Sequence, residues 1–149
     1  MSKYIVLSNA TSSPGSGQQS ISQALKAFNK TQRPFSGPLN IATFNVRTLL
    51  QTGQQALLAK SLDERNIDIC AISESRLPES GCTVINVPNS KHYFKLYYSG
   101  PNNRNGLHGV AISLSSRLLP YVTAFMPVNE RLAIIKLNSR PLTITIIAA

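Results

Sequence analysis

Apolar and polar positions between residues 39 and 77 follow the pattern of a strand, a helix and a second strand. Residues 41–45 and 68–74 are short, mainly apolar runs with the length of buried strands. Between them, residues 54–65 repeat apolar side chains at helical spacing, which places Leu57, Leu58 and Leu62 on one face. Because a strand–helix–strand unit joins its strands by a right-handed crossover, we predict two parallel neighbouring strands.

Beyond residue 77 the pattern predicts further strands and little helix. Short apolar runs indicate strands at 83–87, 110–114, 119–125, 132–137 and 142–147. The turn sequence at 138–141 predicts that the last two form a hairpin. The aromatic stretch 93–98 could stack on nucleic-acid bases, although packing in a core or on an edge strand explains it better. We therefore predict an α/β fold, a partial α/β sandwich of mixed, mostly antiparallel sheet.

The first 38 residues differ in composition from the rest of the chain. They hold four basic residues and no acidic residue, and residues 8–20 are rich in Ser, Gly, Gln and Asn. This composition is typical of a flexible segment, although residues 21–28 could form a short helix. We predict a flexible basic N-terminal segment at 1–38 and one domain at 39–149.

The chain of 149 residues carries a formal charge of +9, spread along its length. This charge favours a polyanionic partner such as nucleic acid, although a solvated basic surface would give the same count. No apolar run approaches the roughly 18 residues of a membrane span, and residues 4–7 are too few for a signal peptide. We expect no membrane association and an intracellular protein, nuclear or cytoplasmic. No stable protein partner can be inferred from the sequence. Both cysteines are expected to be reduced.

The two predicted parallel strands end in polar residues that could bind a ligand or take part in catalysis, Asn45 and Glu74. Parallel strands present their carboxyl ends at one edge of a sheet, so these side chains should converge there. A carboxamide and a carboxylate suit a hard divalent cation and a phosphate oxygen. The alternatives are a turn cap for Asn45 and a surface ion pair for Glu74 with Arg47 or Arg76.

The same residues carry a family resemblance. Ile-Ala-Thr-Phe-Asn-Val-Arg-Thr-Leu at 41–49 and Asp-Ile-Cys-Ala-Ile-Ser-Glu-Ser-Arg-Leu at 68–77 resemble the start of an endonuclease/exonuclease/phosphatase domain. The closest resemblance is to endonucleases of non-LTR retrotransposons and to sequences called craniofacial development protein 2-like. Later segments at 109–114, 127–132 and 142–149 agree with it.

This resemblance implies a phosphodiesterase chemistry and roles for particular residues. Asn45 corresponds to an active-site Asn, and Glu74 to the principal metal-binding Glu, so the implied cofactor is Mg²⁺, with Mn²⁺ as a substitute. Arg47 and Arg76 could contact phosphate, with solvated side chains as the alternative. The implied partner is nucleic acid, with DNA favoured over RNA, although a small phosphoester is also compatible with the family.

The later motifs of the family supply a Tyr, an Asp–Asn pair and a closing Asp–His pair, which this sequence lacks. No Asp follows Asp68, so we expect neither His92 nor His108 to have the carboxylate that orients a catalytic His. We therefore expect an amino-terminal fragment of a Mg²⁺-dependent endonuclease, inactive alone. A non-catalytic nucleic-acid-binding remnant and a truncated retroelement product without function are the alternatives. We also expect the final strand at 142–147 to leave a sheet edge uncovered and the chain to be poorly soluble.

Overall fold

The computed structural model describes residues 4–9, 35–102, 107–139 and 142–149. For residues 4–9 it describes the path of the backbone. The helix considered at 21–28 lies outside the described residues.

The predicted strand–helix–strand unit is present. It consists of β2 (Ile41–Asn45), α2 (Thr52–Glu64) and β3 (Ile69–Ser73). The two strands are parallel and in register from Ile41 opposite Ile69 to Asn45 opposite Ser73. The predicted parallel pairing is therefore confirmed, with the helix beginning two residues earlier than its apolar face suggested.

A five-stranded sheet forms around this unit in the order β2-β3-β6-β5-β4. Its other strands are β4 (Ser80–Asn86), β5 (Tyr93–Ser99) and β6 (Val110–Ser115). The pair β2–β3 is parallel and the remaining pairs are antiparallel, as the prediction of a mixed, mostly antiparallel sheet requires. All five residues of β3 are buried, because both faces of the sheet are covered.

A second sheet has the order β1-β9-β8-β7. Its strands are β1 (Tyr4–Asn9), β7 (Val122–Asn129), β8 (Leu132–Ser139) and β9 (Leu142–Ala148). The predicted hairpin is confirmed as β8–β9. The strand expected at 119–125 starts only at Val122, because Ser116–Tyr121 form the 3₁₀ helix η1, in which Pro120 cannot donate a backbone hydrogen bond.

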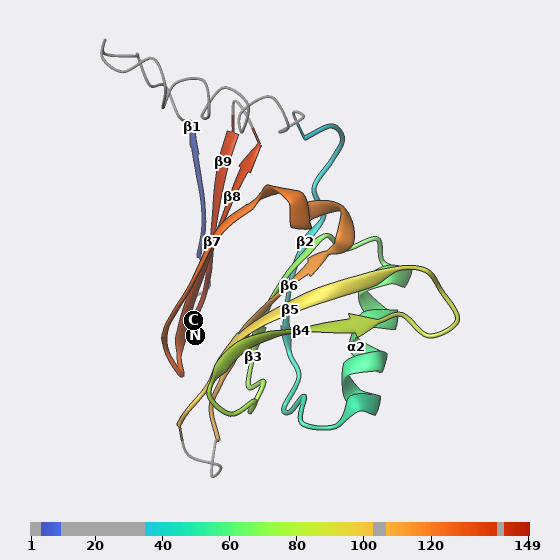
Figure 1. Cartoon of the computed structure of the whole chain (residues 1–149), viewed down its shortest axis with the longest axis vertical. Coiled ribbons are helices and arrows are strands. Elements are labelled where there is room, and N and C mark those ends of the chain that lie inside the picture. Colours follow the sequence, from blue (N-terminus) through green and yellow to red (C-terminus); the bar gives the residue numbers. More distant parts are fainter. Residues whose placement is uncertain (1–3, 10–34, 103–106, 140–141) are drawn as a thin grey trace, which may run out of the picture.

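The layers run from α2 through the five-stranded sheet to the second sheet (Figure 1). One buried cluster lies between the two sheets and includes Ile112, Ile135 and Ile146. Another lies under α2 and includes Leu62 and Ile72. The chain is thus an α/β protein with two packed sheets. From the aromatic stretch, Phe94 and Tyr97 are buried, and Tyr97 packs on Phe125 with ring centroids 5.2 Å apart.

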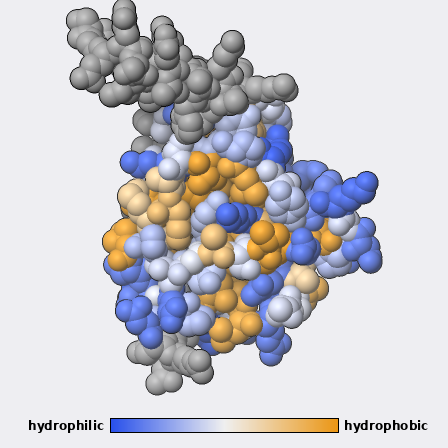
Figure 2. Space-filling view, viewed as in Figure 1, coloured by the Kyte–Doolittle hydropathy of each residue, from blue (hydrophilic) through white to orange (hydrophobic). Residues whose placement is uncertain are grey.

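Part of the predicted flexible segment is a strand. Residues Tyr4–Asn9 form β1, which pairs antiparallel with β9, while residues 10–34 lie outside the described part of the chain. The expectation that the final strand leaves its edge uncovered is therefore wrong, because β8 and β1 pair with its two sides. Apolar side chains still interrupt the polar surface (Figure 2), and Leu57 and Leu107 are about two-thirds exposed.

Candidate active site

Asn45 and Glu74 meet at the carboxyl ends of β2 and β3. Asn45 is the last residue of β2 and lies opposite Ser73 in the parallel register, and Glu74 follows directly. The Asn45 side-chain amide donates a hydrogen bond to Glu74 Oε1 at 2.8 Å. The convergence expected from the order of the strands is therefore confirmed, whereas the catalytic and metal-binding roles of the two residues stay predictions.

The neighbouring Arg47 and Arg76 lie beside Asn45 and Glu74. We call this group at the carboxyl ends of β2 and β3 the rim. The Arg47 backbone N–H donates to Asn45 Oδ1 at 3.2 Å, which holds the carboxamide with its amino group towards Glu74. Arg76 Nη2 lies 4.0 Å from Glu74 Oε2, and both side chains are more than one-third exposed. The alternative of a Glu74–Arg76 ion pair is thus present in the structure, as a long and solvent-screened contact worth little stability.

The backbone of the rim is strained. Arg47, Glu74 and Arg76 have positive φ angles of 60°, 58° and 55°, a region that side chains other than glycine rarely adopt. Each such residue costs on the order of 1–3 kcal/mol, and such residues gather at functional sites. The strain is held by backbone hydrogen bonds from Leu49 to Ser75 and from Ser75 to Gly109.

Gly109 allows this close approach of the loops. Its φ is +131°, and a Cβ placed there would lie 2.7 Å from Ser75 Oγ and 2.9 Å from the Arg76 nitrogen. Ser75 Oγ and Arg76 Nε are themselves buried and have no hydrogen-bond partner in the described part of the chain. Buried polar atoms of this kind are uncommon, and here they lie next to Glu74.

Two further residues complete the rim: His108, for which the sequence predicted no catalytic role, and Arg131, which the sequence reasoning did not single out. His108 and Arg131 line a hollow of about 20 Å³ with Ser73, Glu74 and Glu130, which is room for roughly one water. Arg131 Nη2 donates to His108 Nε2 at 3.2 Å. The Asn129 side chain accepts from the Arg131 backbone N–H at 2.8 Å, so an Asx turn fixes the start of β8. In the sequence, segment 127–132 stands out only for its family resemblance, and its approach to Glu74 was not predicted.

The donor set at the rim does not form a closed site for a divalent cation. Glu74 is the carboxylate at the end of β3, and its two oxygens face the donors Asn45 and Arg76. Among the described residues no group of three or more His, Cys, Asp or Glu side chains could hold a metal ion. With Glu74 as the proposed ligand and Glu130 on the wall of the same hollow, the rim suits a hydrated Mg²⁺ that takes its other ligands from water and phosphate, which makes a weak site.

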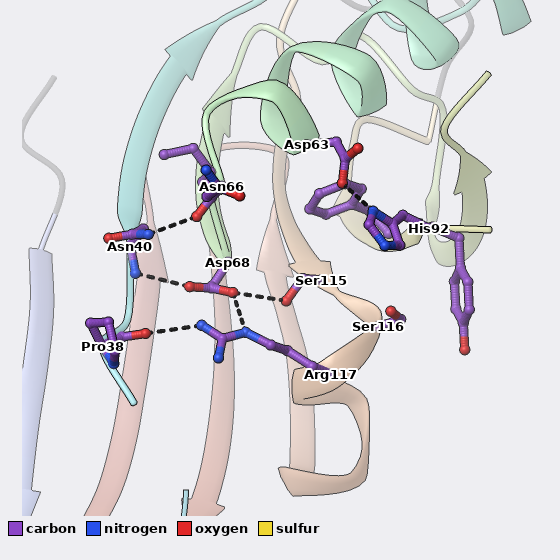
Figure 3. A pocket seen from close by; sticks show the side chains of 12 residues that line it. Pro38, Asn40, Asp63, Asn66, Asp68, His92, Ser115, Ser116 and Arg117 are labelled. Carbon is purple, nitrogen blue, oxygen red and sulfur yellow. Dashed lines mark hydrogen bonds and ion pairs between the residues drawn. The ribbon is translucent and has the colours of Figure 1, made fainter. Parts of the chain in front are cut away.

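A larger hollow of about 360 Å³ lies at the other end of the strands of this sheet, where β2 and β3 begin (Figure 3). There His92 Nδ1 donates to Asp63 Oδ1 at 2.7 Å, which joins the start of β5 to α2. The sequence argument that no carboxylate would orient a histidine is therefore wrong for His92. Asp63 precedes it in the chain, but the whole length of β3 separates this end of the strands from Glu74.

Asp68 and Arg117 form the other wall of this hollow (Figure 3). Burial would raise the pKa of Asp68, but hydrogen bonds from Arg117, the Asn40 backbone and Ser115 outweigh it and hold the pKa below its usual value. Arg117 also donates to the Pro38 carbonyl at 2.9 Å. These groups satisfy one another and fasten the starts of β2 and β3 to the end of β6, so the arrangement points to a structural role.

No protein-family model and no curated protein matches this chain. Within the described ranges, none of the helices has the length and apolar character needed to traverse a bilayer. Any functional assignment therefore rests on the motifs and on the geometry of the rim.

Proposed function

We propose that this chain carries the Asn–Glu part of a nuclease-type phosphodiesterase site, resembling the start of an endonuclease/exonuclease/phosphatase domain of retrotransposon type. The observation that supports it most is the 2.8 Å hydrogen bond between Asn45 and Glu74 at the carboxyl ends of two parallel strands. In that position a carboxylate and an amide face a common ligand. The positive φ angles at Arg47, Glu74 and Arg76 are compatible with such a site, although Asn66, Glu79 and Asn89 have similar φ angles elsewhere.

The ligand of this rim is the phosphodiester backbone of nucleic acid, with DNA favoured. Arg47 and Arg131 are exposed and make no ion pair among the described residues, while Arg76 has a buried Nε that lacks a partner. Guanidinium groups form charge-assisted hydrogen bonds with phosphate oxygens. Such contacts position a backbone without reading its sequence.

Glu74 would supply one ligand to Mg²⁺, or to Mn²⁺ in its place. The bound ion would add charge neutralisation at the phosphate. Asn45 would keep the Glu74 carboxylate oriented through its amide group. Because Glu74 is the one carboxylate for which a metal-binding role is proposed, we expect the ion to be held weakly and mainly when phosphate is present.

Among the described residues, the rim has no histidine paired with an orienting carboxylate that could activate water. His108 Nε2 accepts a hydrogen bond from Arg131 and has no carboxylate partner in the described part of the chain. His92 has Asp63, but that pair lies at the other end of the strands. We therefore propose that the chain binds phosphodiesters and does not hydrolyse them unaided.

A complementation assay tests this function. A family-type second half bearing the missing Tyr, Asp, Asn and His residues is fused to the chain, and nicking of supercoiled plasmid is measured with Mg²⁺. The fusion should nick, Glu74→Ala should abolish nicking, and Glu64→Ala should leave it intact because Glu64 is an exposed residue of α2. Nicking that persists in the Glu74→Ala fusion would contradict the assigned role.

A non-catalytic nucleic-acid-binding protein is the second candidate, favoured by the exposed arginines of the rim. Here binding, not cleavage, would be the selected property. Fusion to the second half would then give no nicking, while salt-sensitive binding to duplex DNA would persist. Absence of both properties would leave a retroelement product without function.

A further inference from the structure

Strand β1 forms one side of the second sheet and is attached there through its pairing with β9. Tyr4–Asn9 pair with Leu142–Ala148 in antiparallel register, with Val6 opposite Thr145 and Ser8 opposite Thr143. Among the described strands, β1 has β9 as its sole neighbour in the sheet order. Releasing β1 would therefore break one ladder of hydrogen bonds and leave the β7–β8–β9 pairing in place.

The chain leaves β1 at the same end of the sheet at which the described chain resumes with Phe35. Asn9 lies opposite Leu142, and Leu142 lies opposite Ser139 in the β8–β9 hairpin. The Phe35 backbone N–H donates to Ser139 Oγ, so the chain returns to the same end, at the top of Figure 1. Withdrawal of β1 requires no other described element to move.

Phe35 is anchored independently of β1. Its ring packs edge-on against Tyr121 with centroids 5.6 Å apart, and the Arg117 guanidinium lies 5.1 Å from its ring centroid. The domain is thus held from residue 35 onwards by contacts that the first strand does not make.

If β1 were released, the exposed edge of β9 would be prone to pair with another strand. Residues 142–148 read Leu-Thr-Ile-Thr-Ile-Ile-Ala, β-branched in five of seven positions and without charge, and residues 4–9 are also uncharged. A long, uncharged edge of this kind is a template for pairing with another chain. Neither strand contains a charge that would repel the corresponding strand of another copy.

We propose that the β9 edge is an acceptor site for an extended, uncharged strand, and that two copies of this chain exchange Tyr4–Asn9 reciprocally to form a dimer. The exchanged pairing has the same register as the pairing within one chain, so the two states differ little in contact energy. A tethered strand competes at an effective concentration on the order of millimolar, so the exchanged dimer is a minor species in dilute protein.

Disulfide trapping accumulates such a minor species. Full-length chains carrying Val6→Cys are mixed with full-length chains carrying Thr145→Cys, both with the exposed Cys82 replaced by Ser. Directly opposed residues in an antiparallel pair have Cα atoms roughly 4.5–5.5 Å apart, within the range of a disulfide. Mild oxidation should give a covalent heterodimer on non-reducing gels.

In the matched control, the second cysteine is placed two residues away along β9. Thr143 lies diagonally to Val6, at a Cα separation of roughly 7–8 Å that a disulfide does not span. Val6→Cys mixed with Thr143→Cys should give several-fold less covalent dimer. Equal yields in the two mixtures would overturn the exchange, because they would reflect random collision.

A single chain that carries both Val6→Cys and Thr145→Cys tests the register itself. In dilute solution it should form an intrachain crosslink. If this crosslink forms but the mixed chains do not crosslink, β1 stays within its own chain and the exchange is refuted. If neither forms, the acceptor register is refuted. Native mass spectrometry of concentrated labelled and unlabelled wild-type chain, which should show mixed dimers, checks the same inference without substitutions.

Discussion

His92 Nδ1 lies 2.7 Å from Asp63 Oδ1, at the end of the five-stranded sheet opposite to Glu74. The histidine–carboxylate pair that a hydrolytic site would need is therefore present among the described residues but is placed a strand length away. The rim around Glu74 instead has His108, whose partner is Arg131.

The first prediction follows from this placement. The purified chain should show no plasmid nicking with Mg²⁺ or Mn²⁺, because general acid–base assistance, typically about 10²–10⁴-fold, is missing at the rim. Any trace activity should be unchanged in His92→Gln. Metal-dependent nicking that Glu74→Ala abolishes would show that the rim is a complete site.

Binding of nucleic acid should depend on the rim arginines. Arg47→Gln or Arg131→Gln should weaken binding to duplex DNA of any sequence and lower the slope of log affinity against log salt by about one. Lys60→Gln is the control, because Lys60 is exposed on α2 and pairs with Glu64. Fluorescence anisotropy across a salt series measures both quantities. An equal loss in the Lys60 variant would indicate general charge attraction without a defined rim.

Gly109 should be intolerant of a side chain. Gly109→Ala should lower the free energy of unfolding by about 1–3 kcal/mol, because its φ is +131° and the new Cβ would meet Ser75 and Arg76. Gly53→Ala, in the first turn of α2, has open space within 4 Å and should instead stabilise by no more than the roughly 0.5–1 kcal/mol typical of a helix interior. Urea denaturation distinguishes the two. A stable Gly109 variant would mean that the loops at the rim can separate without cost.

The Asp68–Arg117 pair should make stability depend on acid. Burial raises the pKa of Asp68, but the hydrogen bonds from Arg117, the Asn40 backbone and Ser115, together with the charge of Arg117, outweigh burial and hold the folded-state pKa below its usual value of 3.8. A depressed carboxyl pKa contributes stability that is present above pH 3.8 and is lost as the pH falls through the folded pKa. Thermal unfolding measured between pH 2 and pH 6, a range in which acid denaturation is usual, tests this loss of stability.

Two substitutions separate this contribution from the remaining carboxylates. Asp68→Asn should flatten the acid dependence below about pH 4 while lowering stability at neutral pH. Arg117→Met leaves the Asp68 carboxylate without its cation and should lower stability at neutral pH, by less than the roughly 3–5 kcal/mol of a fully buried pair because the Arg117 side chain is 46% exposed to solvent. An acid profile unaltered by Asp68→Asn would assign the dependence to other groups.

Two hydrogen-bonded pairs in this chain are each 29 positions apart, and only one of them could be predicted from the sequence. Asn45 and Glu74 are 29 positions apart, and so are Asp63 and His92. The first pair could be placed from sequence because each residue ends a strand of one strand–helix–strand unit, whose handedness and parallel order are fixed by backbone sterics. The second pair joins a helix to a strand, and no local rule relates their ends.

The boundaries of single elements show the same division. The hairpin β8–β9 was predictable because a turn sequence separates two apolar runs. The delayed start of β7 was not, because residues 119–121 are apolar enough for a strand but are held in η1, with Leu118 buried in the core between the two sheets.

By itself, the sequence determined the α/β class, the parallel pair β2–β3 and the meeting of Asn45 with Glu74, since these depend on periodicity and chain handedness. Only the tertiary structure decided that Arg131 reaches His108, that Arg117 neutralises Asp68, and that Tyr4–Asn9 cover the edge of β9. The physical reason is that these contacts depend on how separate layers pack. Packing is set by the burial of the whole apolar surface and not by any short stretch of residues.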